Sequence, residues 1–365
     1  MRVVYDYQIF NWQRYGGISR YFCELASRID SFPDSEARLV AGLHINEYLA
    51  HDYRLLTIGK QRGSNKLFNR FGDVINRQWS GYYLNAQPPD ILHYTYYHPQ
   101  IAVKKSIKVL TVYDMIHERF ADAAIQDKGQ VTLKKAAMVA AVDSIICPSE
   151  CSKRDLVEFC QIDPAKVTVI YQGNGLTAPI PIAPPAGIKP YLLVVGERNW
   201  YKNFERLLQA YASYPAFCRD FDLRCFGAID LTKQELALID RLGLPRASVK
   251  WQTGSDAELA GLYQQAALFV YPSLYEGFGY PPLEAMVAGC PVACSNVSCF
   301  PETVADAAEL FDPYDVDSIA QGLRNVLYSP ARSAELVVRG KQNVQRFSWD
   351  KCAQEHYQLY KSLLN

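Results

Sequence analysis

Two glutamates eight positions apart, Glu276 and Glu284, enclose a loop that contains glycines and aromatic residues. Gly277 and Gly279 allow the backbone to approach a ligand closely. A helix that begins near Pro281 would direct the positive end of its dipole toward an anionic group. The carboxylates can accept hydrogen bonds from sugar and ribose hydroxyls, so the pattern predicts a site for a phosphate with an attached sugar. The alternative is that Glu284 only complements the helix dipole and Glu276 is a solvated loop residue.

Two cations, Arg198 and Lys202, follow an apolar segment that ends at Gly196. Ligands usually bind beyond the carboxyl ends of parallel strands, where such side chains would lie. A departing diphosphate accumulates negative charge, and cations whose contacts strengthen as the bond breaks stabilise the transition state. The pair therefore predicts stabilisation of a leaving group, against the alternative of a solvated turn.

The first half of the chain carries further candidates. Gly16 and Gly17 precede an expected helix and would let the backbone approach a ligand; a plain helix-initiating turn is the alternative. Asp114 and His117 come just after an expected strand, where polar side chains often serve a site.

Aromatic residues and histidines gather near another strand end, at His93, Tyr94, Tyr96, Tyr97 and His98. We interpret this group as an aromatic wall for an acceptor rather than as catalytic machinery.

A basic segment spans residues 54–79, with a single acidic residue and several interleaved apolar ones. Such composition is typical of a solvated face, which is the favoured interpretation. The alternative is a peripheral contact with an anionic membrane surface, which would be useful to an enzyme with a lipid-linked acceptor.

The composition excludes several classes of protein. Lysine plus arginine equals aspartate plus glutamate at 38 each, so no global field attracts nucleic acid. With 49% hydrophobic and 21% charged residues the chain is globular. No secretory leader or membrane-spanning run is apparent, so a cytoplasmic protein is expected. The ten cysteines are interpreted as reduced and buried, and Cys290, Cys294 and Cys299 lack the spacing of a zinc site.

Short apolar runs alternate with amphipathic segments along the whole chain, which predicts α/β architecture with two Rossmann-like parallel sheets. The expected strands of the first sheet are 2–6, 37–42, 91–95, 108–114, 144–147 and 167–171, and those of the second are 191–196, 223–227, 248–251, 268–271, 291–295 and 308–311. We predict a first domain over 1–175, a proline-rich linker over 176–190 and a second domain over 191–347. The segment 348–365 is expected to form a helix that returns to the first domain.

The sequence resembles the retaining glycosyltransferases of family 4, which have the GT-B fold of two Rossmann-like domains facing a central cleft. The segment from Pro272 to Met286 carries the spacing of two glutamates that is typical of that family, and 196–204, 289–302, 143–156 and 169–175 resemble further segments of it. At the strand end near Asp114 the chain departs from the family, because Tyr113 stands where a histidine is usual. This departure leaves the role of His117 open.

The resemblance implies roles for individual residues. Arg198 and Lys202 would contact the donor diphosphate, Glu276 the transferred sugar and Glu284 the ribose, with Asp114 and His117 as further catalytic candidates. No divalent metal or other cofactor is expected, and no residue is assigned as general base. The remaining donor-binding candidates are Gly16, Gly17, Gly196, Asn203, Gly277, Phe278, Gly279, Tyr280 and Leu283.

The overall similarity is greatest to bacterial polysaccharide mannosyltransferases. It implies transfer of mannose from GDP-mannose to a carbohydrate or lipid-linked oligosaccharide hydroxyl in lipopolysaccharide or O-antigen biosynthesis. Transfer of glucose or N-acetylglucosamine from a UDP-sugar is an alternative, as is a non-catalytic carbohydrate-binding protein on the same fold. An NAD-dependent oxidoreductase is disfavoured because neither expected domain begins with the dinucleotide-binding glycine motif.

Overall fold

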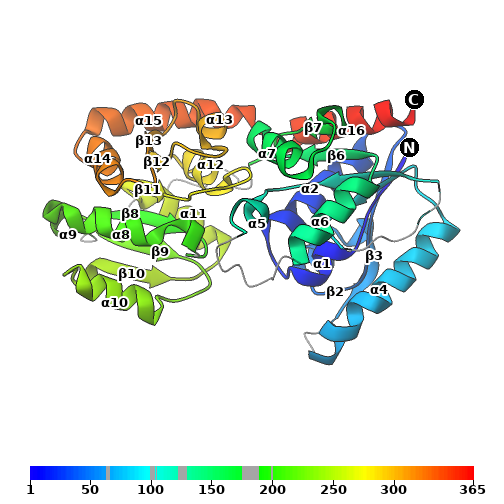
Figure 1. Cartoon of the computed structure of the whole chain (residues 1–365), viewed down its shortest axis with the longest axis horizontal. Coiled ribbons are helices and arrows are strands. Elements are labelled where there is room, and N and C mark those ends of the chain that lie inside the picture. Colours follow the sequence, from blue (N-terminus) through cyan, green and yellow to red (C-terminus); the bar gives the residue numbers. More distant parts are fainter. Residues whose placement is uncertain (63–65, 99–102, 104, 122–129, 175–188, 199) are drawn as a thin grey trace. The chain divides into compact units, whose positions relative to one another are not determined.

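A computed structural model describes residues 1–62, 66–98, 103, 105–121, 130–174, 189–198 and 200–365, with the side chains of 66–71 outside the description. The chain divides into two compact units, of which the first comprises Met1–Gly173 and Ser348–Asn365 and the second Asn174–Phe347 (Figure 1). Most of the predicted linker 176–190 lies outside the described residues. The two-sheet α/β architecture and the helix that returns to the first unit are confirmed.

The first unit contains a seven-stranded parallel sheet in the order β3-β2-β1-β4-β5-β6-β7. Its strands are β1 (Arg2–Tyr5), β2 (Glu36–His44), β3 (Thr57–Gln61), β4 (Ile91–Tyr94), β5 (Ile107–Thr111), β6 (Ser144–Cys147) and β7 (Val167–Val169). Its helices are α1 (Gln8–Trp12), α2 (Gly17–Ser31), α3 (Glu47–His51), α4 (Lys66–Ala86), α5 (Ile116–Arg119), α6 (Gln130–Ala141), α7 (Glu150–Cys160) and α16 (Trp349–Leu364), with 3-10 turns at Arg54–Leu56 and Pro164–Lys166.

The second unit contains a six-stranded parallel sheet in the order β10-β9-β8-β11-β12-β13. Its strands are β8 (Tyr191–Val195), β9 (Asp222–Phe226), β10 (Val249–Gln252), β11 (Leu268–Tyr271), β12 (Val292–Ser295) and β13 (Glu309–Phe311). Its helices are α8 (Phe204–Ser213), α9 (Pro215–Asp220), α10 (Lys233–Arg241), α11 (Asp256–Gln265), α12 (Tyr280–Val287), α13 (Phe300–Val304), α14 (Val316–Leu327) and α15 (Pro330–Asn343), with 3-10 turns at Trp200–Lys202, Arg246–Ser248 and Val344–Arg346.

Both sheets reverse their strand order beside their first strand. In the second unit β8 pairs with β9 on one side and with β11 on the other, so the loops that leave β8 and β11 diverge around a topological switch point. Ligands of open parallel sheets bind at such points. The fold therefore brings the segment after Gly196 and the segment after Tyr271 to one edge of the second sheet.

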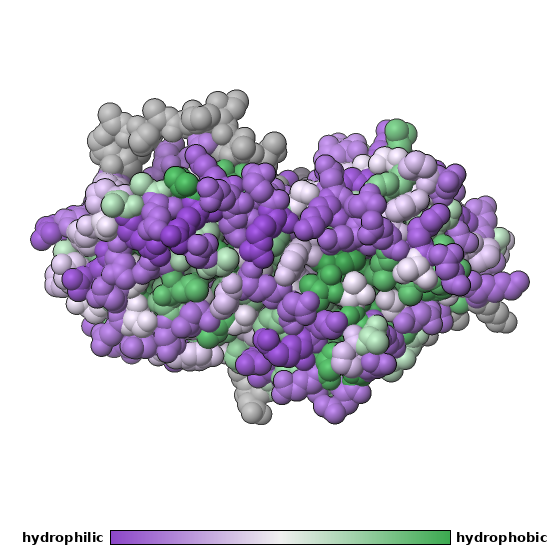
Figure 2. Space-filling view, turned by 90° about the horizontal axis from the view of Figure 1, so that it is seen from above, coloured by the Kyte–Doolittle hydropathy of each residue, from purple (hydrophilic) through white to green (hydrophobic). Residues whose placement is uncertain are grey.

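Apolar side chains fill the interior of each unit, and hydrophilic residues cover most of the face shown in Figure 2. The ten cysteines are free, and eight of them are buried, as expected for reduced thiols. Within the parts of the chain that the structure describes, no helix combines the length and apolar character needed to cross a membrane.

A buried polar network holds α16 in the first unit, where α16 lies against α2. The His356 Nδ1 lies 2.7 Å from the carbonyl oxygen of Cys352, which can only accept, so Nδ1 carries the proton. The His356 Nε2 then accepts from the Tyr21 hydroxyl at 2.7 Å. On β4, His93 lies 2.7 Å from the Tyr360 hydroxyl and is fully buried. Both histidines are therefore part of the core.

The stability of the first unit is expected to fall as the pH is lowered from 7 to 5. Burial lowers the pKa of His356 to about 4, and burial with the neighbouring His356 lowers the pKa of His93 well below its usual value. Unfolding therefore takes up two protons below about pH 6.5. Burial raises the pKa of Asp6 to about 6, so its protonation in the folded state offsets one of them.

One net proton corresponds to a loss of roughly 1.4 kcal/mol of unfolding free energy per pH unit. Urea unfolding at pH 5, 6 and 7 measures this slope, and His356→Gln is expected to remove most of it. Equal midpoints at pH 5 and pH 7 in the natural protein would contradict the assignment.

Candidate active site

Lys202 and Glu276 meet at the switch point of the second sheet. The Lys202 Nζ donates to Glu276 Oε1 at 2.6 Å and to the Tyr271 hydroxyl at 2.8 Å. Both charged side chains remain partly exposed, at 17% and 13%. Burial alone would lower the pKa of Lys202, but the adjacent Tyr271 and Glu276 hold it well above the usual range. The ammonium group therefore stays charged beside a carboxylate that solvent can reach.

The backbone of Glu276 is held by a serine from the neighbouring loop. The Glu276 N–H donates to Ser298 Oγ at 3.1 Å, and Ser298 Oγ donates to the Glu276 carbonyl at 2.6 Å. Ser298 itself has a φ of 59°, a strained left-handed conformation for a residue with a side chain. Sequence reasoning missed both Ser298 and Tyr271; the only signal was that each stands at or after the end of a strand beside the switch point.

Glu284 is the fifth of the eight residues of α12, beyond its first turn, and is half-buried. Its Oε2 accepts from the Tyr263 hydroxyl of α11 at 3.2 Å. Burial, reinforced by the Glu284 charge, raises the pKa of Tyr263 well above its usual value, so the hydroxyl keeps its proton and remains a donor. The hydrogen bond from Tyr263 thus fixes the Glu284 carboxylate, and part of the side chain remains accessible to solvent.

The start of α12 differs from the predicted phosphate cradle. Pro281 and Pro282 are the second and third residues of the helix, and proline has no N–H to donate. Among the first three residues only Tyr280 can offer its amide. Gly279, with a φ of +83°, precedes the helix, and a Cβ there would lie 3.1 Å from Phe300. Glycine is therefore required at the turn, but the helix provides fewer phosphate donors than expected.

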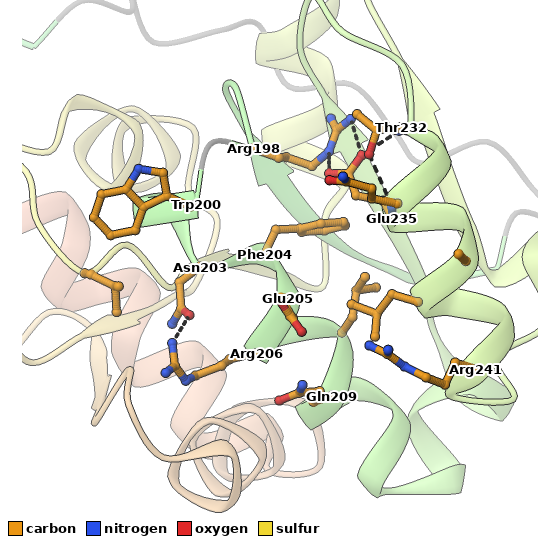
Figure 3. Close-up of a pocket in the computed structure, with 15 residues that line it drawn as sticks. Arg198, Trp200, Asn203, Phe204, Glu205, Arg206, Gln209, Thr232, Glu235 and Arg241 are labelled. Carbon is orange, nitrogen blue, oxygen red and sulfur yellow. Dashed lines mark hydrogen bonds and ion pairs between the residues drawn. The ribbon is translucent and has the colours of Figure 1, made fainter. Parts of the chain in front are cut away.

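Arg198 and Lys202 have different partners. The Arg198 Nε donates to Glu235 Oε1 at 2.7 Å, and its Nη2 donates to the carbonyls of Ile229 and Asp230 at 3.0 and 2.9 Å. Only 4% of its side chain is exposed. Figure 3 shows Arg198 directed toward Glu235, which also caps α10 through Thr232. The structure therefore uses Arg198 to attach the loop after β8 to α10 rather than to form a pair with Lys202.

Asn203 has a similar supporting position. Its Nδ2 donates to the carbonyls of Pro272 and Pro313, at 3.1 and 2.7 Å, and its side chain is buried. Arg206 donates to its Oδ1 at 2.9 Å (Figure 3). Asn203 thus ties the loops after β8, β11 and β13 together, which fixes Lys202 beside Glu276.

The other donor-binding candidates of this unit divide into two groups. Gly196 has a φ of +108° and lies next to Gly227. A Cβ added at Gly227 would lie 2.7 Å from the carbonyl oxygen of Gly196. Gly277 is half-exposed beside Glu276. By contrast, Phe278 and Leu283 are buried, so their side chains serve packing. Their contact with a donor stays a prediction.

A pocket of about 900 Å³ lies in the second unit next to these loops. It is lined by residues of α8 and α10, among them Arg241, and by Arg198, Trp200 and Leu274 (Figure 3). Lys202, Glu276 and Glu284 are not among its lining residues. The pocket is therefore adjacent to the candidate site and distinct from it.

Asp114 and His117 belong to the first unit, where both are half-buried after β5. The Asp114 carboxylate accepts from the Ile116 N–H at 3.1 Å. Lys135 donates to the Asp114 carbonyl at 2.9 Å and to Glu118 at 2.8 Å. The turn from 114 to 118 is thus held at both ends by one buried lysine.

The predicted aromatic acceptor wall is wrong for most of its members. His93, Tyr94 and Tyr97 are buried, because β4 lies inside the sheet and its side chains pack against α16 and neighbouring elements. Only Tyr96 and His98 retain some exposure.

Gly16 and Gly17 stand at the start of α2. A Cβ at Gly16 would lie 2.5 Å from the end of the Gln13 side chain, so a larger residue there would displace that side chain. The Gln13 Oε1 in turn accepts from the Ser19 N–H at 3.1 Å. This geometry explains the glycine as a helix start and leaves Gly17 exposed.

Two separate parallel α/β units, the second with charged side chains at its switch point, define the GT-B class of fold. Two family models match consecutive parts of the chain: glycosyltransferase family 4 matches residues 15–174, and glycosyl transferases group 1 matches residues 182–343. The chain therefore belongs to the family 4 glycosyltransferases.

A relative and two solved structures illustrate the similarity. O-antigen chain mannosyltransferase B of Escherichia coli is 37% identical over 175 residues, which cover 47% of this chain and only 46% of that protein. The sucrose-phosphate synthase structure from Thermosynechococcus elongatus superposes with a TM-score of 0.79 at 21% identity, over 99% of this chain and 98% of that one. Anabaena HepE in complex with UDP and glucose gives a TM-score of 0.75 at 17% identity, over 99% of both chains.

Proposed function

We propose that this chain is a retaining, metal-independent glycosyltransferase that uses a nucleotide diphosphate sugar. The observation that carries the proposal is the contact between Lys202 and Glu276 at the switch point of the second sheet. A cation and a carboxylate side by side suit a ligand that has a phosphate next to a sugar.

In this proposal each charged group has one task. Lys202 stabilises the diphosphate as it departs with increasing negative charge. Glu276 accepts hydrogen bonds from hydroxyls of the transferred sugar, and Glu284 accepts them from the ribose. Arg198, whose charge is balanced by Glu235, positions the loop that carries Lys202. The leaving phosphate assists deprotonation of the acceptor on the same face, and no side chain is assigned as general base.

The preferred donor is GDP-mannose, and the preferred acceptor is a carbohydrate or lipid-linked oligosaccharide hydroxyl in bacterial surface-polysaccharide biosynthesis. The identity to an O-antigen mannosyltransferase supports this choice, although the match spans less than half of that relative. A UDP-sugar is the second candidate, since a structure with a similar fold holds UDP and glucose.

Calorimetric titration of the full chain with GDP, UDP, ADP and dTDP, with and without EDTA, tests the donor site. We expect one nucleotide, GDP, to bind and to raise the melting temperature, with no effect of EDTA. Selective binding of UDP would show that the donor is a UDP-sugar rather than GDP-mannose. Loss of nucleotide binding in EDTA would contradict metal independence. A product whose anomeric configuration is inverted relative to that of the donor would overturn the retaining mechanism.

A further inference from the structure

The helix α4 of the first unit is amphipathic, but several of its polar residues are buried and several of its apolar residues are exposed. Over residues 72–86, the part of the helix whose side chains the structure describes, the buried side carries the small or polar residues Gly72, Asn76 and Ser80, together with Leu84. Its outward side carries large apolar or aromatic residues that are exposed, namely Val74, Ile75, Trp79 and Tyr82 at 42%, 44%, 37% and 79%. A helix on a water-exposed surface normally shows the opposite arrangement. We call these four exposed residues the outer face of α4.

Polar contacts hold the inner side of α4 against β2. The Asn76 Oδ1 accepts from the Leu43 N–H at 2.8 Å, and its Nδ2 donates to the Leu43 carbonyl at 2.9 Å. These bonds sit where the β2–β3 register shifts, between Val40 and Gly42. Hydrogen bonds therefore dock the inner side of the helix on β2, and the exposed outer face takes no part in that contact.

Positive charge accompanies the outer face. Arg77 lies on α4 and is partly exposed, and Lys60 is exposed on β3. The Arg62 guanidinium lies instead on the inner side of the helix, beside Gly72, and donates to Asn11 Oδ1 at 3.1 Å. The one acidic residue of α4 is Asp73, and its carboxylate lies 3.1 Å from His98 Nε2. Aromatic rings contribute as well, since Trp79 stacks on Tyr83 with centroids 5.7 Å apart. Tryptophan and tyrosine are favoured at the boundary between lipid headgroups and water.

We propose that the outer face of α4 binds the surface of an anionic lipid bilayer. Apolar and aromatic side chains would enter the headgroup region while Lys60 and Arg77 neutralise lipid charge. A second copy of the chain fits less well, because a two-fold contact brings the same cations of both copies together. In Figure 1, α4 lies at the periphery of the first unit, with β2 beside it. The proposal goes beyond donor chemistry, because it concerns where the enzyme meets a lipid-linked acceptor.

Co-sedimentation of the full chain with vesicles tests the proposal. We compare phosphatidylcholine vesicles with vesicles that contain 30% phosphatidylglycerol, at low and high salt. The natural protein is expected to bind only the anionic vesicles and to dissociate as salt increases. Ile75→Ser with Tyr82→Ser removes two well-exposed side chains and is expected to weaken binding about tenfold or more. Arg77→Gln is expected to weaken it less.

Matched controls keep the result interpretable. Leu133→Ser changes a side chain of α6 that is 73% exposed in the same unit and is expected to leave vesicle binding unchanged. Nucleotide binding should be equal in all variants, so failure of the membrane proposal is distinguishable from failure of the proposed function. Unchanged vesicle binding by the α4 variant, or no binding by the natural protein, would overturn the proposal. If the α4 variant instead loses self-association in sedimentation, the partner of the outer face is a second copy of the chain and not a bilayer.

Discussion

Lys202→Met is expected to lower the turnover number by about two to three orders of magnitude while leaving the fold intact. The reason is that the ammonium group, held beside Glu276, is the described cation best placed to stabilise a departing diphosphate. Because its contact with the phosphate strengthens in the transition state, the loss should appear in kcat as well as in kcat/KM. Initial rates of nucleotide release over a range of donor concentrations separate the two quantities.

Three variants complete this experiment. Glu276→Gln keeps the size of the side chain and is expected to give a comparable loss, because an amide cannot accept hydrogen bonds through both of its terminal atoms. Lys233→Met makes the same substitution at an exposed position of α10 and should leave turnover unchanged. Ser298→Ala should give an intermediate loss, because it releases the backbone of Glu276 but keeps the carboxylate. A Lys202→Met protein with nearly normal kcat would remove Lys202 from the mechanism.

The architecture was predictable from sequence because its signals are local. Buried parallel strands are short apolar runs, and the loops that serve the site begin where such runs end. The expected strands near 191–196 and 268–271 correspond to β8 and β11, whose neighbourhood defines the switch point. The strand β3 was missed because Thr57–Gln61 contains a single aliphatic residue and a glycine, which an edge strand tolerates.

Side-chain partners were not predictable, since they depend on contacts between distant segments. Arg198 looked equivalent to Lys202 in sequence, but Glu235, which lies 37 positions away, takes up its charge. His93 looked like a site residue at a strand end, whereas Tyr360 from the last helix buries it. Ser298 carried no signal beyond its place after a strand end, because its role depends on β12 lying beside β11.

Lys135→Met is expected to cost about 3–5 kcal/mol of unfolding free energy, because it leaves the buried Glu118 carboxylate without a counter-ion. Lys135 is 1% exposed and Glu118 7%, and their charged atoms lie 2.8 Å apart. Urea unfolding measures the change. An unfolding midpoint equal to that of the natural protein would show that the pair contributes nothing.

The double variant Lys135→Met with Glu118→Leu separates the charge from the backbone contact. Removing both charges should recover most of the loss, since apolar pairs often replace buried ion pairs at little cost. It should not recover all of it, because the Asp114 carbonyl still loses the donor at 2.9 Å, worth about 1–3 kcal/mol when buried. If the double variant is as unstable as the single one, the carbonyl contact dominates. In that case Lys135 acts mainly by fixing the turn that carries Asp114 and His117, and turnover should fall in both variants even where they remain folded.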